Sequence, residues 1–325
     1  MNILITRHDK IGDFVVSLPM FKVLKKQRPK LKLFALVSKI NFEFAKNIDF
    51  IDEVILYDKN NLAKTLKDIK KAKIDVSISA FIDTSLAWLL FKSRIKTRIA
   101  PATKIAQLFF NKRVTQRRSR VEKCEFEYNL DLLQAYDKDI KLEYAQPLLE
   151  LQDDKKSEIY NKFKSDYNID EDKEVVALHP GFGGSSDGNL TLEDYVKLAY
   201  DISKKDNIKV VFTFGPDDLS TKEEIEKLVD FDAIMYESKG SIIDFCLLLS
   251  NFKLFISTST GPMHLSAISN SKTISFFGSN LFATPKRWAS INEKTNQNNF
   301  VIPNNYDKSI YENIQKCVSE QLNEK

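Results

Sequence analysis

Apolar and polar residues alternate in blocks along this chain, and the rhythm of the blocks predicts a parallel α/β architecture. Short apolar runs of strand length recur between longer segments that have helical spacing. In the first half the runs predict strands at residues 2–6, 32–37, 53–57, 74–79 and 97–100. In the second half they predict strands near residues 174–179, 208–214, 233–236, 254–257 and 273–277. Because alternating strands and helices form parallel sheets, we expect two Rossmann-like, doubly wound domains.

A polar segment near residues 152–173 separates the two sets of strands, and we expect the domain boundary there. The N-terminal domain is predicted over residues 1–160 and the C-terminal domain over residues 170–306. The last segment, residues 307–325, has the pattern of a helix.

The turn after the predicted strand at 254–257 has the composition of a phosphate site. Thr260, Gly261 and Pro262 lie between this strand and a helical segment that starts at Met263. They supply a capping hydroxyl, a glycine and a proline suited to the first helical turn. The N–H groups of such a turn point toward a bound anion. An ordinary strand-to-helix turn has the same composition, so that alternative stays open.

A second turn of this kind follows the strand Glu174–His179. Three glycines and two serines occur within residues 181–186, and Thr191 opens the next helix. Such a loop lets several N–H donors converge on one anion. The loop lacks the Gly-Lys-Ser/Thr of a P-loop, and no Gly-x-Gly-x-x-Gly follows the first strand. Two anion-binding turns in one half of the chain indicate a diphosphate ligand.

The N-terminal strand leads into a polar turn that carries candidate catalytic chemistry. The turn reads Arg7-His-Asp-Lys-Ile-Gly-Asp13 and lies at the carboxyl end of a predicted strand, where open α/β sheets bind ligands. Asp13 is a candidate general base, and Arg7 and Lys10 are candidate contacts to an anionic substrate. The alternative is that Asp13 only caps the following helix.

Taken in order, the three segments resemble glycosyltransferase family 9, the ADP-heptose:lipopolysaccharide heptosyltransferases. The family's opening pattern matches Arg7 through Pro19, and its His-Pro-Gly-x-Gly-Gly-Ser pattern matches His179 through Ser185. Its Thr-Gly-Pro-x-His-Leu pattern falls at Ser259 through Leu265, followed by a strand that ends in Phe-Gly at Gly278. The resemblance extends over residues 1 to about 290.

This resemblance implies a GT-B architecture in which the C-terminal helix packs back toward the first domain. It implies an inverting transfer of heptose, or a related sugar, from ADP-heptose to a lipopolysaccharide or lipooligosaccharide core, with Asp13 as the base. Residues expected to bind the nucleotide-diphosphate sugar are Gly181, Gly183, Gly184, Ser185, Ser186, Asp217, Ser259, Thr260, Gly261, Pro262, Met263 and His264. Asp217 and Asp218 are candidates for the ribose hydroxyls, although Gly215-Pro216-Asp217 also has the composition of a plain turn.

Two positions depart from the family pattern and leave the donor open. Many members carry Asp where this chain has Ser259, and many carry Lys near Gly188, where no cation occurs here. The alternatives are therefore a transferase that uses another nucleotide sugar and a catalytically silent relative that binds a glycolipid or nucleotide.

Positive charge is concentrated between residues 92 and 123. This segment carries eleven Lys or Arg and one acidic residue, against a net charge of +4 for the whole chain. Clustered cations suit nucleic acid, an anionic glycolipid at a membrane, or a plain solvated face. The lack of a nucleic-acid motif favours an anionic glycolipid acceptor over nucleic acid. Residues expected to contact the acceptor are Arg7, Lys10, Arg94, Arg98, Arg113, Arg117 and Arg118.

Composition predicts a cytoplasmic enzyme, and the basic segment together with the family resemblance implies peripheral association with the inner face of the cytoplasmic membrane. The apolar runs are too short to span a bilayer, and no signal segment is recognisable. Three scattered cysteines predict reduced thiols, and three scattered histidines give no metal-binding spacing. We therefore expect neither a resident metal nor another cofactor, with the nucleotide sugar as a substrate.

Overall fold

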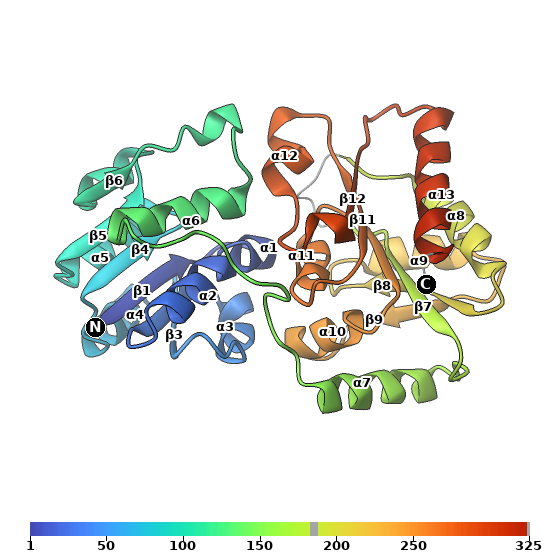
Figure 1. Cartoon of the computed structure of the whole chain (residues 1–325), viewed down its shortest axis with the longest axis horizontal. Coiled ribbons are helices and arrows are strands. Elements are labelled where there is room, and N and C mark those ends of the chain that lie inside the picture. The colour runs from blue at the N-terminus through green and yellow to red at the C-terminus, as the bar shows by residue number, and fades with distance from the viewer. Residues whose placement is uncertain (183–187, 324–325) are drawn as a thin grey trace. The chain divides into compact units, whose positions relative to one another are not determined.

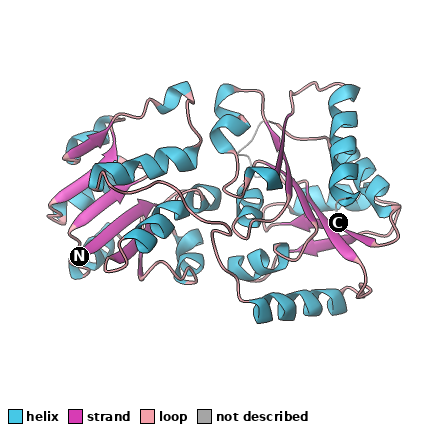
Figure 2. Ribbon diagram, in the orientation of Figure 1, coloured by secondary structure: helices cyan, strands magenta, loops and turns pink. Residues whose placement is uncertain are grey.

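The computed structural model describes residues 1–182 and 188–323 of the chain. The chain divides into two compact units, Met1–Leu148 and Leu149–Lys325. Each unit contains one six-stranded sheet in which all neighbouring strands are parallel, as the alternating pattern predicts. Figure 2 shows the two magenta sheets with cyan helices packed around each of them.

The first sheet has the strand order β3-β2-β1-β4-β5-β6. Its strands are β1 (Asn2–Arg7), β2 (Lys32–Val37), β3 (Glu53–Leu56), β4 (Val76–Ser79), β5 (Thr97–Pro101) and β6 (Lys112–Val114). The central strand β1 is buried from Ile3 to Arg7, which explains its nearly continuous apolar sequence. The chain leaves β1 toward β2 and β3 and returns at β4. The carboxyl ends of β1 and β4 therefore form the topological switch point at which such sheets bind ligands.

The first unit has six α-helices and two short 3₁₀ helices. They are α1 (Ile11–Val15), α2 (Leu18–Gln27), α3 (Lys39–Lys46), α4 (Leu62–Lys71), α5 (Thr84–Lys92), η1 (Ile105–Phe109), η2 (Arg118–Arg120) and α6 (Glu125–Tyr136). Right-handed crossovers place α2 and α3 on one face of the sheet and α4 and α5 on the other. In agreement, α2 packs with α6, whereas α5 packs with α4 and η1 (Figure 1).

The second sheet has the order β12-β11-β10-β7-β8-β9. Its strands are β7 (Glu174–His179), β8 (Ile208–Phe214), β9 (Ile234–Glu237), β10 (Leu254–Thr258), β11 (Thr273–Phe277) and β12 (Gln297–Val301). Its helices are α7 (Asp153–Asp166), α8 (Leu192–Ser203), α9 (Leu219–Leu228), α10 (Ile242–Leu249), α11 (Gly261–Ala267), η3 (Leu281–Ala283), α12 (Pro285–Trp288), η4 (Lys294–Asn296) and α13 (Lys308–Asn323). Here β7 and β10 are the central pair, and both strands are almost entirely buried.

The sequence pattern predicts ten of these strands within a few residues but misses β6 and β12, one at an edge of each sheet. Both are polar: β6 reads Lys-Arg-Val and β12 reads Gln-Asn-Asn-Phe-Val. An edge strand needs little apolar burial because its pairing comes from the backbone of a single neighbour. An apolar pattern therefore cannot reveal such a strand.

One expected boundary differs from the observed packing. The helix α7 packs with α10 and belongs to the second unit, so the first unit ends at Leu148 instead of near residue 160. The buried residues of the C-terminal helix α13, Tyr311, Ile314, Val318 and Leu322, join the apolar core of the second unit. Their spacing of three to four residues forms one apolar stripe, which that core covers.

No helix among residues 1–182 and 188–323 combines the length and the hydropathy needed to cross a bilayer.

Candidate active site

The first group of candidate residues lies at the switch point of the first sheet. Strand β1 ends at Arg7, and α1 begins four residues later at Ile11. Lys10 is the N-cap residue of α1 and is exposed. Asp13 lies inside the first turn of α1, and the N-cap residue Lys10 makes no side-chain capping bond. Asp13 is therefore an acidic residue of the first turn and not the N-cap residue of this helix.

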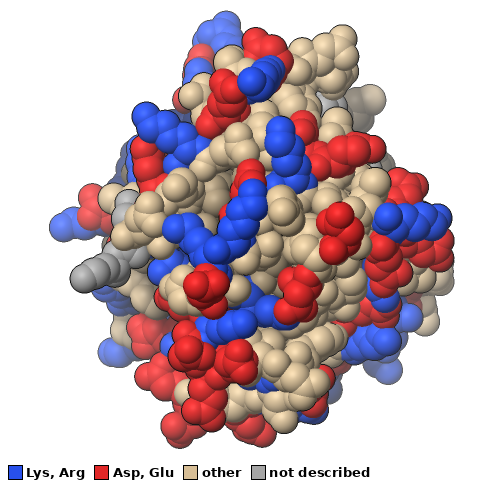
Figure 3. All heavy atoms as spheres, turned by 90° about the vertical axis from the view of Figure 1, so that its right-hand side faces the viewer, with Lys and Arg blue, Asp and Glu red and all other residues tan. Residues whose placement is uncertain are grey.

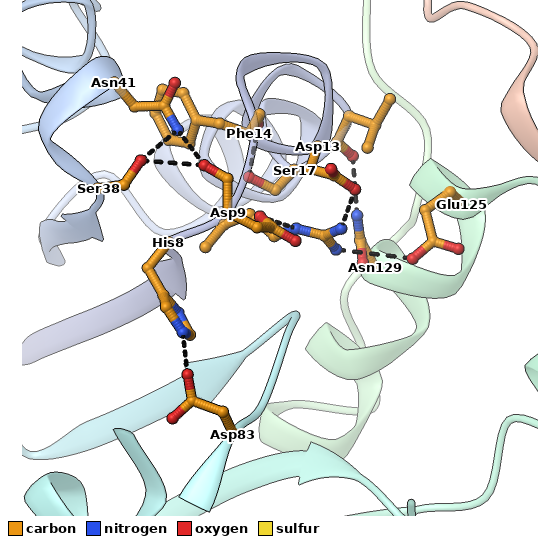
Figure 4. A network of polar contacts seen from close by, with 12 residues as sticks. His8, Asp9, Asp13, Phe14, Ser17, Ser38, Asn41, Asp83, Glu125 and Asn129 are labelled. Carbon is orange, nitrogen blue, oxygen red and sulfur yellow. Dashed lines mark hydrogen bonds and ion pairs between the residues drawn. The ribbon is translucent and has the colours of Figure 1, made fainter. Parts of the chain in front are cut away.

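A buried guanidinium group organises the carboxylates around it. Arg7, whose side chain is 4% exposed, donates from Nε to Asp9 Oδ1 at 2.8 Å and from Nη2 to Asp13 Oδ1. Its Nη1 lies 3.6 Å from Glu125 Oε1. Figure 4 shows Asp9, Asp13 and Glu125 around this group. Burial alone lowers the pKa of Arg7, but the three carboxylates raise it above the ordinary value, so Arg7 stays protonated.

The same environment raises the pKa of Asp13. Burial is the largest cause, and the negative charges of Asp9 and Glu125 act in the same direction. The charge of Arg7 opposes them but does not reverse the shift. The Asp13 side chain remains 18% exposed, so a ligand can reach it. A reachable carboxylate with a raised pKa is a better proton acceptor than an ordinary surface aspartate.

Glu125 is held in place by Arg118, which the basic segment supplies. Arg118 pairs through Nη1 with Glu125 Oε1 and donates from Nε to Gln116 Oε1 at 2.8 Å. Its Nη2 lies 3.3 Å from Asn129 Oδ1. This arginine was expected to contact the acceptor, but its described contacts tie η2 to α6.

The other predicted acceptor arginines fall into two groups. Arg98 donates from Nε to the carbonyl of Phe109 at 2.8 Å and from Nη1 to the carbonyl of Ile95. It therefore links β5 to the end of η1. Arg94, Arg113 and Arg117 are exposed.

The sequence interpretation missed a pair formed beside Arg7 by buried His8 and half-buried Asp83. His8 Nε2 lies 2.7 Å from Asp83 Oδ2, and Asp83 Oδ1 accepts from the N–H of Leu86 as the N-cap of α5. Partial burial alone raises the pKa of Asp83, but these hydrogen bonds hold it at about 2. The His8 ring also lies 4.4 Å from the Tyr57 ring. The available signal was positional, since His8 and Asp83 follow the adjacent strands β1 and β4.

In the second unit, the turn between β10 and α11 does not have the expected side-chain cap. The Thr260 hydroxyl does not cap α11; its Oγ1 lies 3.3 Å from the carbonyl of Thr258. This contact leaves the first-turn N–H groups of α11 without that capping oxygen. Gly261 and Pro262, like Ser259 before them, are partly exposed, while Met263 is buried.

Backbone packing explains why this chain has glycine at position 188. A Cβ atom at Gly188 would overlap backbone atoms of Phe277 and Gly278. The Gly188 carbonyl also accepts from Thr258 Oγ1 at 2.6 Å. The segment is therefore packed against the ends of β10 and β11, and no side chain, cationic or otherwise, fits there.

The ends of β7 and β8 bring the candidate Asp218 together with His179, a histidine to which the sequence gave no site role. Buried His179 lies 3.1 Å from Thr213 Oγ1 through Nδ1 and 3.6 Å from Asp218 Oδ2 through Nε2. Burial lowers the pKa of His179. Asp218 also accepts from the N–H of Gly215 at 2.8 Å and contacts the turn at Gly181. Asp217, which the sequence favoured, is exposed on the outside of this turn.

His264 is a buried residue of α11, and burial lowers its pKa to about 4. Its Nδ1 has no hydrogen-bond partner among the described residues, and its ring lies 6.5 Å from that of Trp288. The histidine is therefore neutral at physiological pH. The predicted contacts Gly183, Gly184, Ser185 and Ser186 lie outside the described residues.

A hollow of about 440 Å³ lies beside the ends of the second sheet. Its lining comes from the segment after β7, the start of α8 and the segment after β12, and includes Pro180, Phe182, Asn189, Thr191, Pro303 and Tyr306.

Comparison with known proteins relates both units to one family. The model of "Glycosyltransferase family 9 (heptosyltransferase)" matches residues 62–318. A Haemophilus influenzae protein named "Putative glycosyltransferase" is 37% identical over 299 residues, which cover 90% of this chain and 86% of that protein. The Campylobacter jejuni protein "Lipooligosaccharide heptosyltransferase 2" is 24% identical over 290 residues, covering 87% of this chain and 83% of its own.

A solved structure has the same fold at low sequence identity. The E. coli ADP-heptose lipopolysaccharide heptosyltransferase II superposes with a TM-score of 0.80 at 17% identity. The match covers 99% of this chain and 98% of that chain. The two parallel six-stranded α/β units therefore form a GT-B-like fold.

Proposed function

The chain belongs to glycosyltransferase family 9, and on that premise we propose that it transfers a heptose from ADP-heptose to a hydroxyl group of an anionic lipopolysaccharide or lipooligosaccharide core. The name of the C. jejuni relative supports a lipooligosaccharide acceptor, and the name of the E. coli structure supports ADP-heptose as the donor.

The observation that carries this proposal is the carboxylate of Asp13, accessible and with a raised pKa beside buried Arg7. We assign Asp13 as the general base. Its Oδ1 accepts from Arg7, so Oδ2 takes the proton of the acceptor hydroxyl. Arg7 fixes the orientation of the carboxylate, while burial, together with the charges of Asp9 and Glu125, keeps the pKa of Asp13 above its ordinary value.

The reaction balances as a single displacement. The acceptor oxygen forms a bond to the anomeric carbon while the bond from that carbon to the diphosphate oxygen breaks. The electron pair of the broken bond leaves with ADP, and the hydroxyl proton passes to Asp13, which later releases it to water. Attack from the face opposite the leaving group inverts the anomeric configuration.

We assign the donor to the second unit, at the carboxyl ends of β7 and β10. There the Thr260 hydroxyl does not cap α11, and buried, neutral His264 follows in the same turn. N–H groups at a helix start stabilise the negative charge that develops on a departing diphosphate. Asp218, buried beside Gly181 and His179, is a better placed polar group than Asp217.

For the acceptor we retain the exposed Arg94, Arg113 and Arg117 as contacts to its anionic groups. Exposed cations attract phosphate and carboxylate groups without the desolvation cost of a buried ion pair. Arg98 and Arg118 are better assigned to structure, because carbonyl or carboxylate partners within the first unit already hold them.

A second donor is favoured by one observation. Ser259 and Gly188 occupy positions where many family members have Asp and Lys, and the packing at Gly188 leaves no room for a side chain. A donor that needs a cation at this point is bound less well here, so a different nucleotide sugar is the alternative.

The test is a transfer assay with purified protein, an acceptor core that lacks the heptose, and a panel of ADP-, UDP- and GDP-linked sugars. We expect ADP release and a product heavier by one heptose only when ADP-heptose and acceptor are both present. Transfer from a UDP- or GDP-linked sugar alone would establish the alternative donor. Nucleotide binding without transfer from any donor would identify a silent relative.

A further inference from the structure

One face of the first unit carries large apolar side chains that are exposed to solvent. Trp88 and Phe91 of α5 are 45% and 48% exposed, and Ile105 and Leu108 of η1 are 81% and 72% exposed. We call these four residues the α5–η1 surface. Scattered exposed apolar residues are ordinary, but a contiguous group marks an interaction site.

Ring contacts join the two elements of this surface. The rings of Trp88 and Phe91, one turn apart on α5, lie 5.9 Å apart between centroids, and Phe109 of η1 lies 5.7 Å from each of them. In a 3₁₀ helix residues three apart point the same way, so Ala106 and Phe109 face the core while Ile105 and Leu108 project outward. In this surface the aliphatic side chains of Ile105 and Leu108 project beside a cluster of aromatic rings.

The chain segment that carries this surface has one sign of charge. No Asp or Glu occurs from Thr84 to Val121, a stretch that contains ten Lys or Arg. Lys92 Nζ lies 4.9 Å from the centre of the Trp88 ring, and Arg98 Cζ lies 5.5 Å from that of Phe91. Lys96 adjoins the end of η1, since its carbonyl accepts from Asn111 at 2.6 Å. By contrast, Figure 3 shows both signs of charge interspersed on a face of the molecule.

We propose that the α5–η1 surface docks the protein on a bilayer that contains anionic phospholipid. Ile105 and Leu108 would enter the boundary between headgroups and acyl chains, and Trp88 and Phe91 would lie at headgroup level, where amphipathic and aromatic side chains are favoured. The exposed Lys92 and Lys96 would neutralise lipid phosphates. This inference concerns a binding surface and does not depend on which sugar is transferred.

Charge argues against a second copy of this chain as the occupant, and the exposed aliphatic side chains argue against a nucleic acid. A second copy of this chain in a symmetric dimer would present the same surface, so it would bring two sets of cations together with no acidic residue of the stretch to pair them. A nucleic acid would satisfy the cations but would leave Ile105 and Leu108 without an apolar partner, because neither aliphatic side chain offers a ring for base stacking. A bilayer satisfies both the charges and the apolar side chains.

The test is co-sedimentation of the full-length protein with vesicles. One set contains phosphatidylethanolamine and phosphatidylglycerol, and the other contains phosphatidylcholine alone. We expect binding to the anionic vesicles and little binding to the neutral ones. Replacing Ile105 and Leu108 together by Ser should weaken binding by at least about tenfold, because each loses its buried apolar area. Replacing Lys92 and Lys96 by Gln should also cost about tenfold or more, since each cation contributes roughly fivefold near an anionic surface.

Matched controls lie on the opposite face of the first sheet. Ile40, at 61% exposure on α3, is an equally open aliphatic residue, and Lys26 and Lys30 are exposed cations at the end of α2. Replacing Ile40 by Ser, or Lys26 and Lys30 by Gln, should leave vesicle binding within about twofold of wild type. Thermal unfolding of every variant should match wild type because the altered side chains are exposed.

The two tryptophans of the chain, Trp88 and Trp288, provide an independent readout. In protein with Trp288→Phe, Trp88 fluorescence should shift to the blue and be quenched by brominated lipid when anionic vesicles are added. Equal vesicle binding by wild type and the Ile105/Leu108 double variant, with no quenching, would overturn the proposal. Binding of random RNA that the lysine variant abolishes and the Ile105/Leu108 variant retains would assign the surface to nucleic acid and also overturn it.

Discussion

Arg7 donates from Nη2 to Asp13 Oδ1, so the last residue of β1 fixes the carboxylate in the first turn of the helix that follows. Arg7 and Asp13 are six positions apart in the sequence. This contact gives Asp13 an orientation, while burial and two further carboxylates give it a raised pKa. Orientation and basicity therefore have different sources, and they can be tested separately.

The first prediction concerns Asp13 as the base. Asp13→Asn keeps the side-chain size but cannot take a proton, so turnover should fall by roughly 10²-fold or more. The melting temperature should stay close to wild type, because ionising a buried carboxyl of raised pKa does not stabilise the fold. The measurement is ADP release alongside thermal unfolding.

Asp9→Asn is the matched control for that variant. It removes another carboxylate partner of Arg7, 2.8 Å from Nε, without touching the proposed base. Its turnover should fall by less than about tenfold. Near-normal turnover of Asp13→Asn would remove Asp13 as the base. If Asp9→Asn were equally damaging, the ion-pair network and not proton transfer would explain the loss.

The second prediction concerns pH. The base must be deprotonated, so kcat/KM should fall as pH falls through the pKa of Asp13, with a midpoint above the ordinary 3.8. Glu125→Gln removes a negative charge that raises this pKa, so the midpoint should move to lower pH. Glu122→Gln makes the same charge change at an exposed pair and should leave the midpoint in place. An equal shift of the pH midpoint in both variants, or no shift in Glu125→Gln, would contradict the assignment of Asp13 as the base.

The third prediction concerns the His8–Asp83 pair. A folded-state pKa of about 2 for Asp83 contributes stability that is present above the unfolded value near 4 and is lost as pH falls toward 2. Asp83→Asn retains an N-cap for α5, so at pH 7 it should lose only the ionic part, roughly 1–2 kcal/mol after allowance for solvent screening at a one-third exposed side chain.

Urea unfolding at pH 7 and near pH 3 tests this prediction, with exposed Asp49→Asn as the control. The difference between wild type and Asp83→Asn should shrink at the lower pH. A difference that stays constant with pH would mean that the pair contributes packing and not charge.

The fourth prediction concerns Gly188. Its Cβ would overlap the backbone of Phe277 and Gly278, which cannot rotate away, so Gly188→Ala should destabilise the protein by about 3 kcal/mol or more. At Gly240 a Cβ would meet Asp244 Oδ2 at an ordinary 3.4 Å, so Gly240→Ala should change stability by about 0.5 kcal/mol or less. A tolerated Gly188→Ala would show that the loop moves freely, and would reopen a place for a cation there.

Sequence alone determined the elements whose signals are local. The apolar run of β1, the glycine and proline that open α11 and the hydroxyl of Thr191, which accepts from Asp194 N–H at 3.2 Å, are each readable within a few residues. The position of Asp13 beyond a strand end was likewise predictable, because parallel sheets bind ligands at that edge. Family membership followed from the order of three such segments.

The tertiary structure decided which distant residues meet. Glu125 reaches Arg7, and Gly188 reaches Phe277, only because crossover connections bring far segments of the chain together, and local periodicity contains no record of those contacts. Arg118 illustrates the difference: its charge belongs to a basic run that is visible in the sequence, whereas its partner Glu125 is brought to it only by the fold. The apolar stripe of α13 could be recognised in the sequence, but the core that covers it could not. An apolar helix face shows that it will be buried and does not show which surface will cover it.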